Sequence, residues 1–234
     1  MLTARLSGGD TSQGHSFATN LALQGNTLVT NAANGVVYVF ERNSQTWSRQ
    51  AELTSNDPNF TLGGALAVKG DTLAAAAAGV VDPTTGQSGA VFVFHRQLGT
   101  WVQEAKLIPS DTRAALFGEF GLAVDGDQLI AGAPLNNGDG AVAAGLAFVF
   151  TRRQGVWQQE AELTADDPSN LALFGDSVDL HNHTAVVGAP RALAPGGDST
   201  GAAYIYARQD GVWSLQQKVQ ALDPQDECAC RRHL

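Results

Sequence analysis

The sequence predicts an all-β protein built from four copies of one four-stranded unit. Four tryptophans, separated by 54, 56 and 56 residues, mark the repeat: Trp47, Trp101, Trp157 and Trp213. A fixed period of this length is typical of repeat architectures, in which each copy is one supersecondary unit. Turn-forming residues recur upstream of each tryptophan, between apolar segments. The copies contain no helical periodicity, so we expect each unit to consist of antiparallel strands.

The tryptophan strand is expected to be the last and outermost strand of each unit. In the third copy, residues 157–163 read Trp-Gln-Gln-Glu-Ala-Glu-Leu. This alternation predicts that Trp157, Gln159, Ala161 and Leu163 face one way and the polar residues the other, as on a strand with one wet face. Closely similar text follows Trp47 and Trp101, and the fourth copy is looser.

Three further strands precede each tryptophan strand. The nearest is a continuous apolar run, which predicts a strand buried on both faces; the four runs are 36–40, 90–94, 146–150 and 202–206. The two earlier strands are joined by Gly-Asn or Gly-Asp in the first three copies, a strong hairpin signal because glycine tolerates positive φ. The fourth copy has His181-Asn182-His183 at this turn.

An aspartate lies four residues after the last apolar position of each tryptophan strand, and another lies four residues after Leu6. These are Asp10, Asp57, Asp111, Asp167 and Asp223, three of them in turn-favouring Asp-Pro pairs. The chain therefore opens on the end of a tryptophan-type strand, at residues 2–6. Four units follow, at 7–53, 54–107, 108–163 and 164–220.

Radially repeated four-stranded units are the blades of a β-propeller. We therefore predict a propeller domain over residues 1–222 with a repeat of about 56 residues, and a flexible tail at residues 223–234. A linear solenoid fits poorly with four strands per unit. Because an open propeller leaves sheets without partners, the four blades are expected either to close into a ring or to be completed by oligomerisation.

The composition excludes some classes of partner. The 234 residues carry 14 Lys and Arg against 23 Asp and Glu, a formal charge of −9. An acidic protein is not expected to bind nucleic acid or anionic membranes. No apolar run approaches the length that a membrane helix needs, so membrane insertion is not expected either. The first ten residues lack the pattern of a signal peptide.

The third and fourth copies carry a recognisable motif. Phe117-Gly118 precedes Gly132-Ala133-Pro134, and Phe174-Gly175 precedes Gly188-Ala189-Pro190. This resembles the FG-GAP repeat of integrin α-subunit β-propellers and of many bacterial surface and secreted proteins, with the bacterial variant most similar. The resemblance extends over residues 2–220, although the first two copies have lost parts of the motif. It implies a propeller fold and an extracellular or cell-surface location, and it says little about activity.

Calcium is the ligand that the resemblance suggests first, because integrin-type blades bind it through a spaced Asp/Asn loop between their first two strands. In this chain the corresponding positions are two-residue turns, such as Gly70-Asp71 and Gly126-Asp127, too short to surround a cation. No cofactor or metal is therefore expected. The alternative calcium ligands are Asn136, Asn137 and Asp139, in an oxygen-rich loop after the second strand of the third copy.

The repeat positions have structural and functional interpretations. The five aspartates are expected to cap turns through backbone N–H groups, the alternative being a cation-attracting ring on one face. The four tryptophans are expected to pack between blades, the alternative being platforms for sugars. His181 and His183 form a conceivable transition-metal pair, although exposed turn histidines are favoured. Cys228 and Cys230, with His233, lie in the tail, where an intermolecular disulfide or no role is favoured over a metal site.

The sequence contains no catalytic motif, so an enzyme is not expected. The leading hypothesis is a non-catalytic binding or assembly module that mediates protein–protein or cell-surface interactions. The alternatives are a carbohydrate-binding, lectin-like propeller, a structural subunit of a homo-oligomer or fibre, and an enzyme accessory domain. The expected partners are a protein or glycan ligand, or further copies of the chain in a homo-oligomer.

Overall fold

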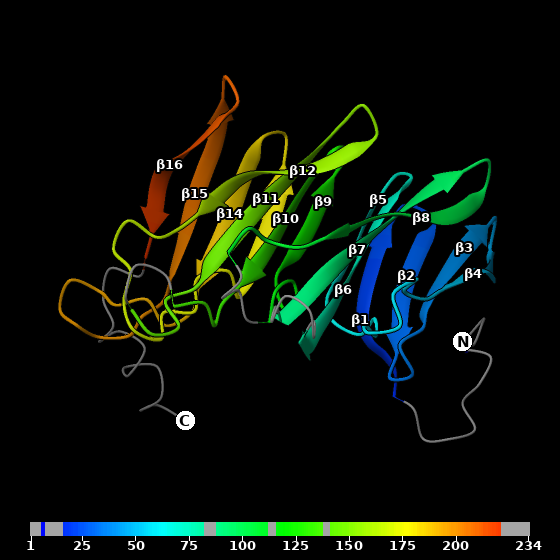
Figure 1. Cartoon of the computed structure of the whole chain (residues 1–234), viewed down its shortest axis with the longest axis horizontal. Helices are drawn as coiled ribbons and strands as arrows, with labels where there is room; N and C mark the ends of the chain where they lie inside the picture. Colours follow the sequence, from blue (N-terminus) through cyan, green and yellow to red (C-terminus); the bar gives the residue numbers. More distant parts are fainter. Residues whose placement is uncertain (1–5, 8–15, 82–87, 112–115, 138–140, 221–234) are drawn as a thin grey trace.

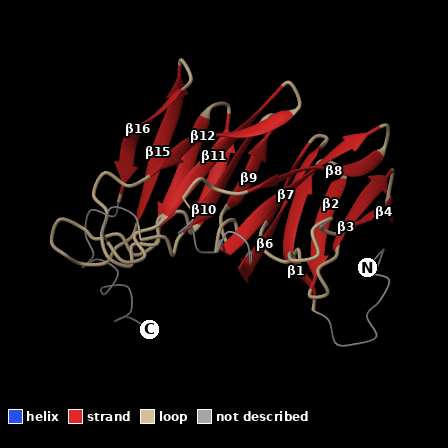
Figure 2. Ribbon diagram, in the orientation of Figure 1, coloured by secondary structure: helices blue, strands red, loops and turns tan. Residues whose placement is uncertain are grey.

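A computed structural model gives the fold, and it describes residues 6–7, 16–81, 88–111, 116–137 and 141–220. These residues form four separate four-stranded antiparallel sheets, and strand is their only regular secondary structure (Figure 2). Each sheet contains four consecutive strands in chain order. The predicted all-β fold of four four-stranded units is confirmed.

The strand bounds follow the sequence repeat. The first sheet contains β1 (Phe17–Gln24), β2 (Thr27–Ala32), β3 (Val37–Asn43) and β4 (Thr46–Leu53). The second contains β5 (Leu66–Lys69), β6 (Thr72–Val81), β7 (Ser88–Gln97) and β8 (Thr100–Leu107). The third contains β9 (Leu122–Asp125), β10 (Gln128–Ala133), β11 (Leu146–Arg153) and β12 (Val156–Leu163). The fourth contains β13 (Ser177–His181), β14 (Thr184–Ala189), β15 (Ala202–Gln209) and β16 (Val212–Val219).

The sheets stack side by side in an open row (Figure 1). The first strands β1, β5, β9 and β13 are neighbours along the row, and the tryptophan strands lie farther out. The first and fourth sheets stand at opposite ends, so the described residues show no closure into a four-bladed ring. One face of the first sheet and one face of the fourth are consequently without a neighbouring sheet.

The core lies between successive sheets rather than at one centre. Trp101 packs in the cluster between the first and second sheets, and Trp157 in the cluster between the second and third. Trp213 borders the cluster between the third and fourth. A sheet therefore buries both of its faces only where another sheet packs on each side. The stability of the row consequently comes from the contacts between successive sheets.

The FG-GAP residues make close contact between sheets possible. Phe174 is fully buried against Tyr204, with ring centroids 5.3 Å apart, and Phe117 packs likewise on Phe148 at 5.8 Å. A Cβ atom on Gly132 would overlap the carbonyl oxygen of Gly175 in the next repeat. Gly132, in the second strand of the third repeat, therefore leaves room for the backbone of the fourth repeat.

The tryptophan strands differ from the prediction in one respect. Each contains a β-bulge at its centre, which in the third sheet shifts the pairing between Val149 and Phe150. Trp157 and Gln159 consequently face the preceding sheet, whereas Ala161 and Leu163 pair on the face toward the following sheet. The expectation that all four side chains share one face is wrong, because a single extra residue reverses the alternation.

The apolar run of the fourth sheet is also less buried than predicted. Tyr204 and Tyr206 are buried against the third sheet, but Ala203 and Ile205 on the other face are partly exposed. The corresponding third strands of the other sheets are buried on both faces. The difference follows from the position of the fourth sheet at the end of the row.

Candidate functional site: Arg–Trp clamps between the sheets

Each tryptophan strand has one side chain at its bulge, on the face of the sheet opposite the tryptophan. The bulged residues are Gln50, Glu104, Glu160 and Gln216, each three residues after the tryptophan. We call the face of a sheet that is turned toward the following sheet its front face and the opposite face its rear face. At two of the bulges this side chain is a glutamate that reaches across the interface to the following sheet.

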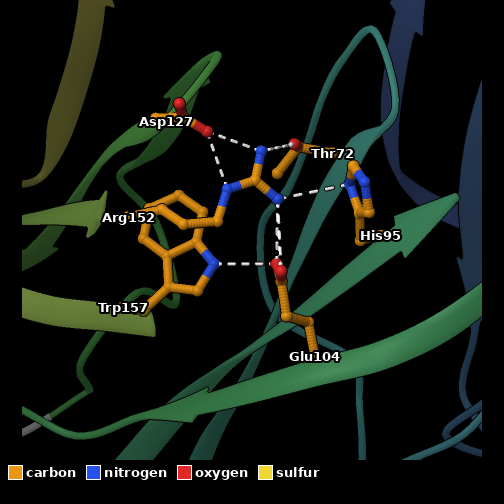
Figure 3. Close-up of polar contacts among 6 residues, drawn as sticks. All are labelled: Thr72, His95, Glu104, Asp127, Arg152 and Trp157. Atoms are coloured by element: carbon orange, nitrogen blue, oxygen red, sulfur yellow. Dashed lines mark hydrogen bonds and ion pairs between the residues drawn. The ribbon is translucent and has the colours of Figure 1, made fainter. Parts of the chain in front are cut away.

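The interface between the second and third sheets shows the full arrangement (Figure 3). Arg152, at the rear of the third sheet, donates to Glu104 Oε2 at 3.0 Å and to Asp127 Oδ1 at 2.7 Å. Its guanidinium lies 5.5 Å from the ring centroid of Trp157, whose Nε1 donates to the same Glu104 oxygen at 2.9 Å. His95 and Thr72 are further neighbours of the guanidinium. We call such a pair of arginine and tryptophan an Arg–Trp clamp.

The arginine of this clamp is held in a highly polar setting. Its side chain is only 15% exposed and Glu104 is 16% exposed. Burial alone lowers the pKa of Arg152, but hydrogen bonds and charges from Asp127 and Glu104 outweigh it and raise the pKa above its usual value. The charge pair is therefore stabilised mainly by its geometry, in which two carboxylates and an aromatic face surround one cation.

The interface between the third and fourth sheets repeats the clamp. Arg208 donates to both oxygens of Glu160, at 2.6 and 2.9 Å, and Trp213 Nε1 donates at 3.2 Å. Thr151 and Arg153 of the third sheet add bonds at 2.9 and 2.7 Å. Burial raises the pKa of Glu160, but these hydrogen bonds, chiefly from Arg208, lower it to about 2. Glu160 is therefore ionised throughout the physiological range.

The interface between the first and second sheets uses a variant of this scheme. Arg96 lies 5.3 Å from the centroid of Trp101 and donates to Asp71 at 2.7 Å. Gln50 occupies the bulge of the first sheet, and Arg96 instead pairs with Glu41 on β3. All three interfaces thus supply a carboxylate from the preceding sheet to an Arg–Trp clamp.

The rear face of the first sheet has the same clamp without a carboxylate. Arg42 lies 5.6 Å from the centroid of Trp47 and donates to Asn26 Oδ1 at 2.9 and 3.1 Å. Its backbone N–H bonds to the Asn26 carbonyl at 2.9 Å, as Arg96 and Arg152 bond to the equivalent turn residues. Among the described residues, no acidic side chain contacts Arg42.

Beside this clamp lie two exposed leucines. Leu21 is 62% exposed and Leu23 is 66% exposed, whereas the equivalent Leu66 and Val68 of the second sheet are 8% and 9% exposed. Leu6 packs at the same rear face, against the cluster that contains Tyr38 and Phe40. Leu6 thus occupies a place beside the first sheet like that of Leu53 beside the second sheet. This position agrees with the register of Leu6 and Asp10 in the sequence. Residues 2–5 of the predicted leading strand lie outside the described residues.

The front face of the fourth sheet is built differently from its equivalents. The central row across the third sheet reads Ala123, Ile130, Val149 and Ala161, all apolar. The same row across the fourth sheet reads Asp179, Val186, Ile205 and Gln217. The first two sheets also have alanine at both ends of this row. Polar residues at both ends therefore distinguish the last sheet.

The structure places the four tryptophans at the rear faces of their sheets, where they belong to the clamps. Trp101 and Trp157 are 7% and 8% exposed. A surface depression lined by Trp101 also contains Asn56 and Gln103, but the Gln103 amide donates to Asn56 Oδ1 at 2.7 Å and accepts the Asn56 backbone N–H at 3.0 Å. Little of the ring and few polar groups are thus free there for a sugar.

The recurrent aspartates contact the following sheet. Asp57 accepts the Asn59 backbone N–H at 3.0 Å and pairs with Lys106 at 2.9 Å, and these hydrogen bonds, chiefly that of Lys106, lower its pKa. Asp167 binds Lys218 at 2.6 Å and the Tyr204 hydroxyl at 2.8 Å. Asp111 accepts a bond from Asn136 at 3.2 Å. Asp10 and Asp223 lie outside the described residues.

The structure describes two of the three predicted calcium ligands, Asn136 and Asn137. Asn136 is fully buried, and Asn137 accepts the Ala143 N–H at 2.9 Å. Asp139 lies outside the described residues. Within the described part of the chain, no group of three or more His, Cys, Asp or Glu side chains is arranged to hold a metal ion.

The two turn histidines have separate partners. His181 lies 3.6 Å from Asp125, and His183 Nδ1 lies 2.9 Å from the Gln128 side-chain oxygen. Both contacts reach back to the third sheet, and the exposed turn that carries them contains Asn182, whose N–H bonds to Asp125. Cys228, Cys230 and His233 lie outside the described residues. The described residues contain no helix that is long and apolar enough to cross a membrane.

The row of four-stranded blades with repeated interfaces defines a β-propeller-type repeat protein. The FG-GAP repeat family matches residues 101–150 and 157–206, so this part of the chain consists of FG-GAP repeats. Each matched segment begins at a tryptophan strand and ends in the third strand of the next sheet, so it spans one interface. No curated protein matches the sequence.

Solved structures with similar folds are distant in sequence. A putative 6-phosphogluconolactonase from Bacteroides uniformis is 11% identical, with a TM-score of 0.58, over 92% of this chain and 58% of that chain. The computationally designed Ika4 protein is 17% identical with a TM-score of 0.47, over 85% of this chain and 95% of that chain. The N-terminal domain of Nup159 is 14% identical with a TM-score of 0.43, over 87% of this chain and 47% of that chain. At this identity, the likeness to the lactonase shows the fold alone.

Proposed function

We propose that this chain is a non-catalytic β-propeller module that binds other proteins, outside the cell, through the rear face of its first sheet, against which no other described sheet packs. The observation that carries the proposal is the rear face of the first sheet, where Leu21 and Leu23 are 62% and 66% exposed. Adjacent exposed apolar side chains on a sheet face mark an interaction site more often than an isolated exposed leucine does.

The interfaces within the chain support this interpretation. At each of them, the residues equivalent to Leu21 and Leu23 are buried, or partly buried in the case of Val178, against the preceding sheet. The rear face of the first sheet therefore has the composition of an interface: Leu21 and Leu23 are exposed beside a charged clamp, next to Tyr38 and Phe40, against which Leu6 packs. The extracellular location rests on the FG-GAP repeats, which are typical of extracellular proteins.

Site-specific photo-crosslinking tests the proposal. A benzophenone amino acid replaces Leu21 in one variant and, in a matched control, Leu98, a fully exposed residue in the turn between β7 and β8 of the second sheet. Each variant is incubated with the extracellular fraction of the cells that produce it. We expect a discrete crosslinked adduct at position 21 that is absent at position 98. If position 21 gives no adduct, or if the two positions give the same diffuse pattern, the proposal is wrong.

A further inference from the structure

We infer that the partner bound at the first sheet is a β-sheet of a different protein that places a glutamate against Arg42 and Trp47. This inference rests on the proposed function, since it names the chemistry of the partner at the same face. The incoming glutamate would occupy the position that Glu104 and Glu160 occupy at the interfaces within the chain. Its strand would cover Leu21 and Leu23 as the preceding sheet covers their equivalents.

The clamp of the first sheet is already organised to receive a carboxylate. Asn26 holds Arg42 through its side chain and its backbone carbonyl, and the Trp47 ring lies against the guanidinium. The same three supports hold Arg152 beside Trp157, where Glu104 is bound. A receptor held in its binding geometry loses little conformational entropy when its ligand arrives.

The charge of the open clamp also favours an anion. Arg152 is neutralised by two carboxylates, those of Glu104 and Asp127. In the first sheet, the turn residue is the neutral Asn26, and no described acid replaces the missing glutamate. Arg42 thus retains a positive charge beside an apolar face, and a partner's carboxylate would form charge-assisted hydrogen bonds with it.

The fourth sheet of this chain lacks the group that the clamp needs. Gln216 stands at its bulge in place of a glutamate, and Ala207 stands where Glu41 pairs with Arg96. Asp179 and Gln217 replace alanines in the row that packs against a following sheet. A second copy, or the chain's own last sheet, would therefore bring no carboxylate to Arg42 and would bury polar groups against leucines. These differences favour a different protein as the occupant.

A gain-of-association experiment tests the inference in the full-length chain. The triple variant Asp179→Ala, Gln216→Glu and Gln217→Ala gives the fourth sheet the front-face residues of the third, including the glutamate. We expect the wild type to sediment as a monomer and the triple variant to associate head to tail. Adding Arg42→Met should weaken this association at least about tenfold. Adding Arg191→Met, at an exposed loop arginine, should leave it unchanged.

Sedimentation velocity measures the dissociation constants, and circular dichroism checks that each variant is folded. A folded triple variant that stays monomeric would show that the first sheet does not accept a glutamate-bearing sheet. Association that is insensitive to Arg42→Met would likewise overturn the role of the clamp. Association of the wild type through Arg42 would place a second copy in the site and refute the choice of partner.

The outcomes separate this inference from the proposed function. A crosslink at position 21 together with a monomeric triple variant would support the protein-binding function. It would refute the inference that the partner places a glutamate against Arg42. Absence of the crosslink, with association of the triple variant that depends on Arg42, overturns the proposed function while the clamp's preference for a carboxylate stands.

Discussion

Replacing Glu160 by glutamine tests whether the clamps stabilise the row of sheets. Glu160 is 8% exposed and accepts two hydrogen bonds from Arg208 and one from Trp213, across the interface between the third and fourth sheets. Glutamine keeps nearly the same shape and one acceptor oxygen. The substitution therefore removes the charge with little change in packing.

The pKa of the carboxyl sets the size of the effect. A group whose pKa falls from 4.5 to about 2 on folding contributes about 3 kcal/mol to the free energy of unfolding at neutral pH. The glutamine oxygen retains part of the bonding, and Arg153, at 64% exposed, returns to water at little cost. Since Arg208 is 19% exposed and keeps its charge, we expect Glu160→Gln to lower the free energy of unfolding by about 2 kcal/mol.

The dependence on pH has a defined sign. Because the folded-state pKa of Glu160 lies below its ordinary value of 4.5, its contribution is complete above that pH and disappears as the pH falls through about 2. Urea denaturation of the wild type and the variant, at several values from pH 7 to pH 2, measures the difference. The difference should be constant near neutrality and should shrink below about pH 4.5.

A matched control is Glu52→Gln, which removes a surface carboxylate paired with Arg49, where both side chains are at least 40% exposed. This change should cost less than about 0.5 kcal/mol. If Glu160→Gln costs no more than the control at pH 7, the clamp does not stabilise the interface. A cost for Glu160→Gln that stays the same from pH 7 to pH 2 would also refute the reasoning.

Three further substitutions have expected outcomes in urea denaturation. Arg152→Met should lower the free energy of unfolding by about 3 kcal/mol because it leaves Glu104, which is only 16% exposed, without its ion-pair partner. Arg42→Met should cost less than about 0.5 kcal/mol because the Arg42 side chain is exposed, and equal costs for the two variants would contradict this reasoning. Gly132→Ala should cost at least about 2 kcal/mol, since its Cβ would overlap a carbonyl oxygen of the next repeat. Gly63→Ala, which has open space and ordinary φ, is its control and should be near neutral. Leu180→Ala, at a 5% exposed position, should cost about 2 to 4 kcal/mol, and a smaller loss would mean that the fourth sheet packs loosely.

The four-sheet architecture was predictable because it depends on features that repeat along the chain. The spacing of Trp101 and Trp157 sets the length of a unit, and Gly126 at positive φ marks a hairpin turn, where glycine has a low energetic cost. The end of the tryptophan-type strand at Leu6 was found in the same way, by its register relative to Asp10. Local chemistry and repetition together determine the order of the strands.

The clamps were not predictable from the same signals. Glu104 and Glu160 stand on the face opposite their tryptophans, which strict alternation assigns to solvent, but in the structure the following sheet packs against that face. A bulge adds one residue to a strand without a distinctive composition, so the sequence of a single chain does not reveal it. The recurring arginine after the third strand was the available signal, since Arg152 and Arg208 lie five residues before their tryptophans.

The openness of the row could not be predicted either. Local patterns specify how a sheet forms and which residues it buries, but the number of sheets that complete a ring depends on the small rotation between neighbours. Leu21 and Leu23 look like core residues in the sequence, as their equivalents in the other copies are. Their exposure becomes visible only when the first sheet is placed at the end of the row (Figure 1).

The clamps also give the row a direction. Every sheet with a predecessor has its arginine and tryptophan at the rear, and it receives a carboxylate from the front of the sheet before it. Two rear faces cannot pair with each other through this chemistry, because Arg42 would then meet Arg42. Association through these faces is consequently head to tail rather than two-fold symmetric. The polar residues Asp179 and Gln217 at one end, and the open clamp at the other, therefore make the two ends chemically different, so a partner with a glutamate-bearing sheet can extend the row only before the first sheet.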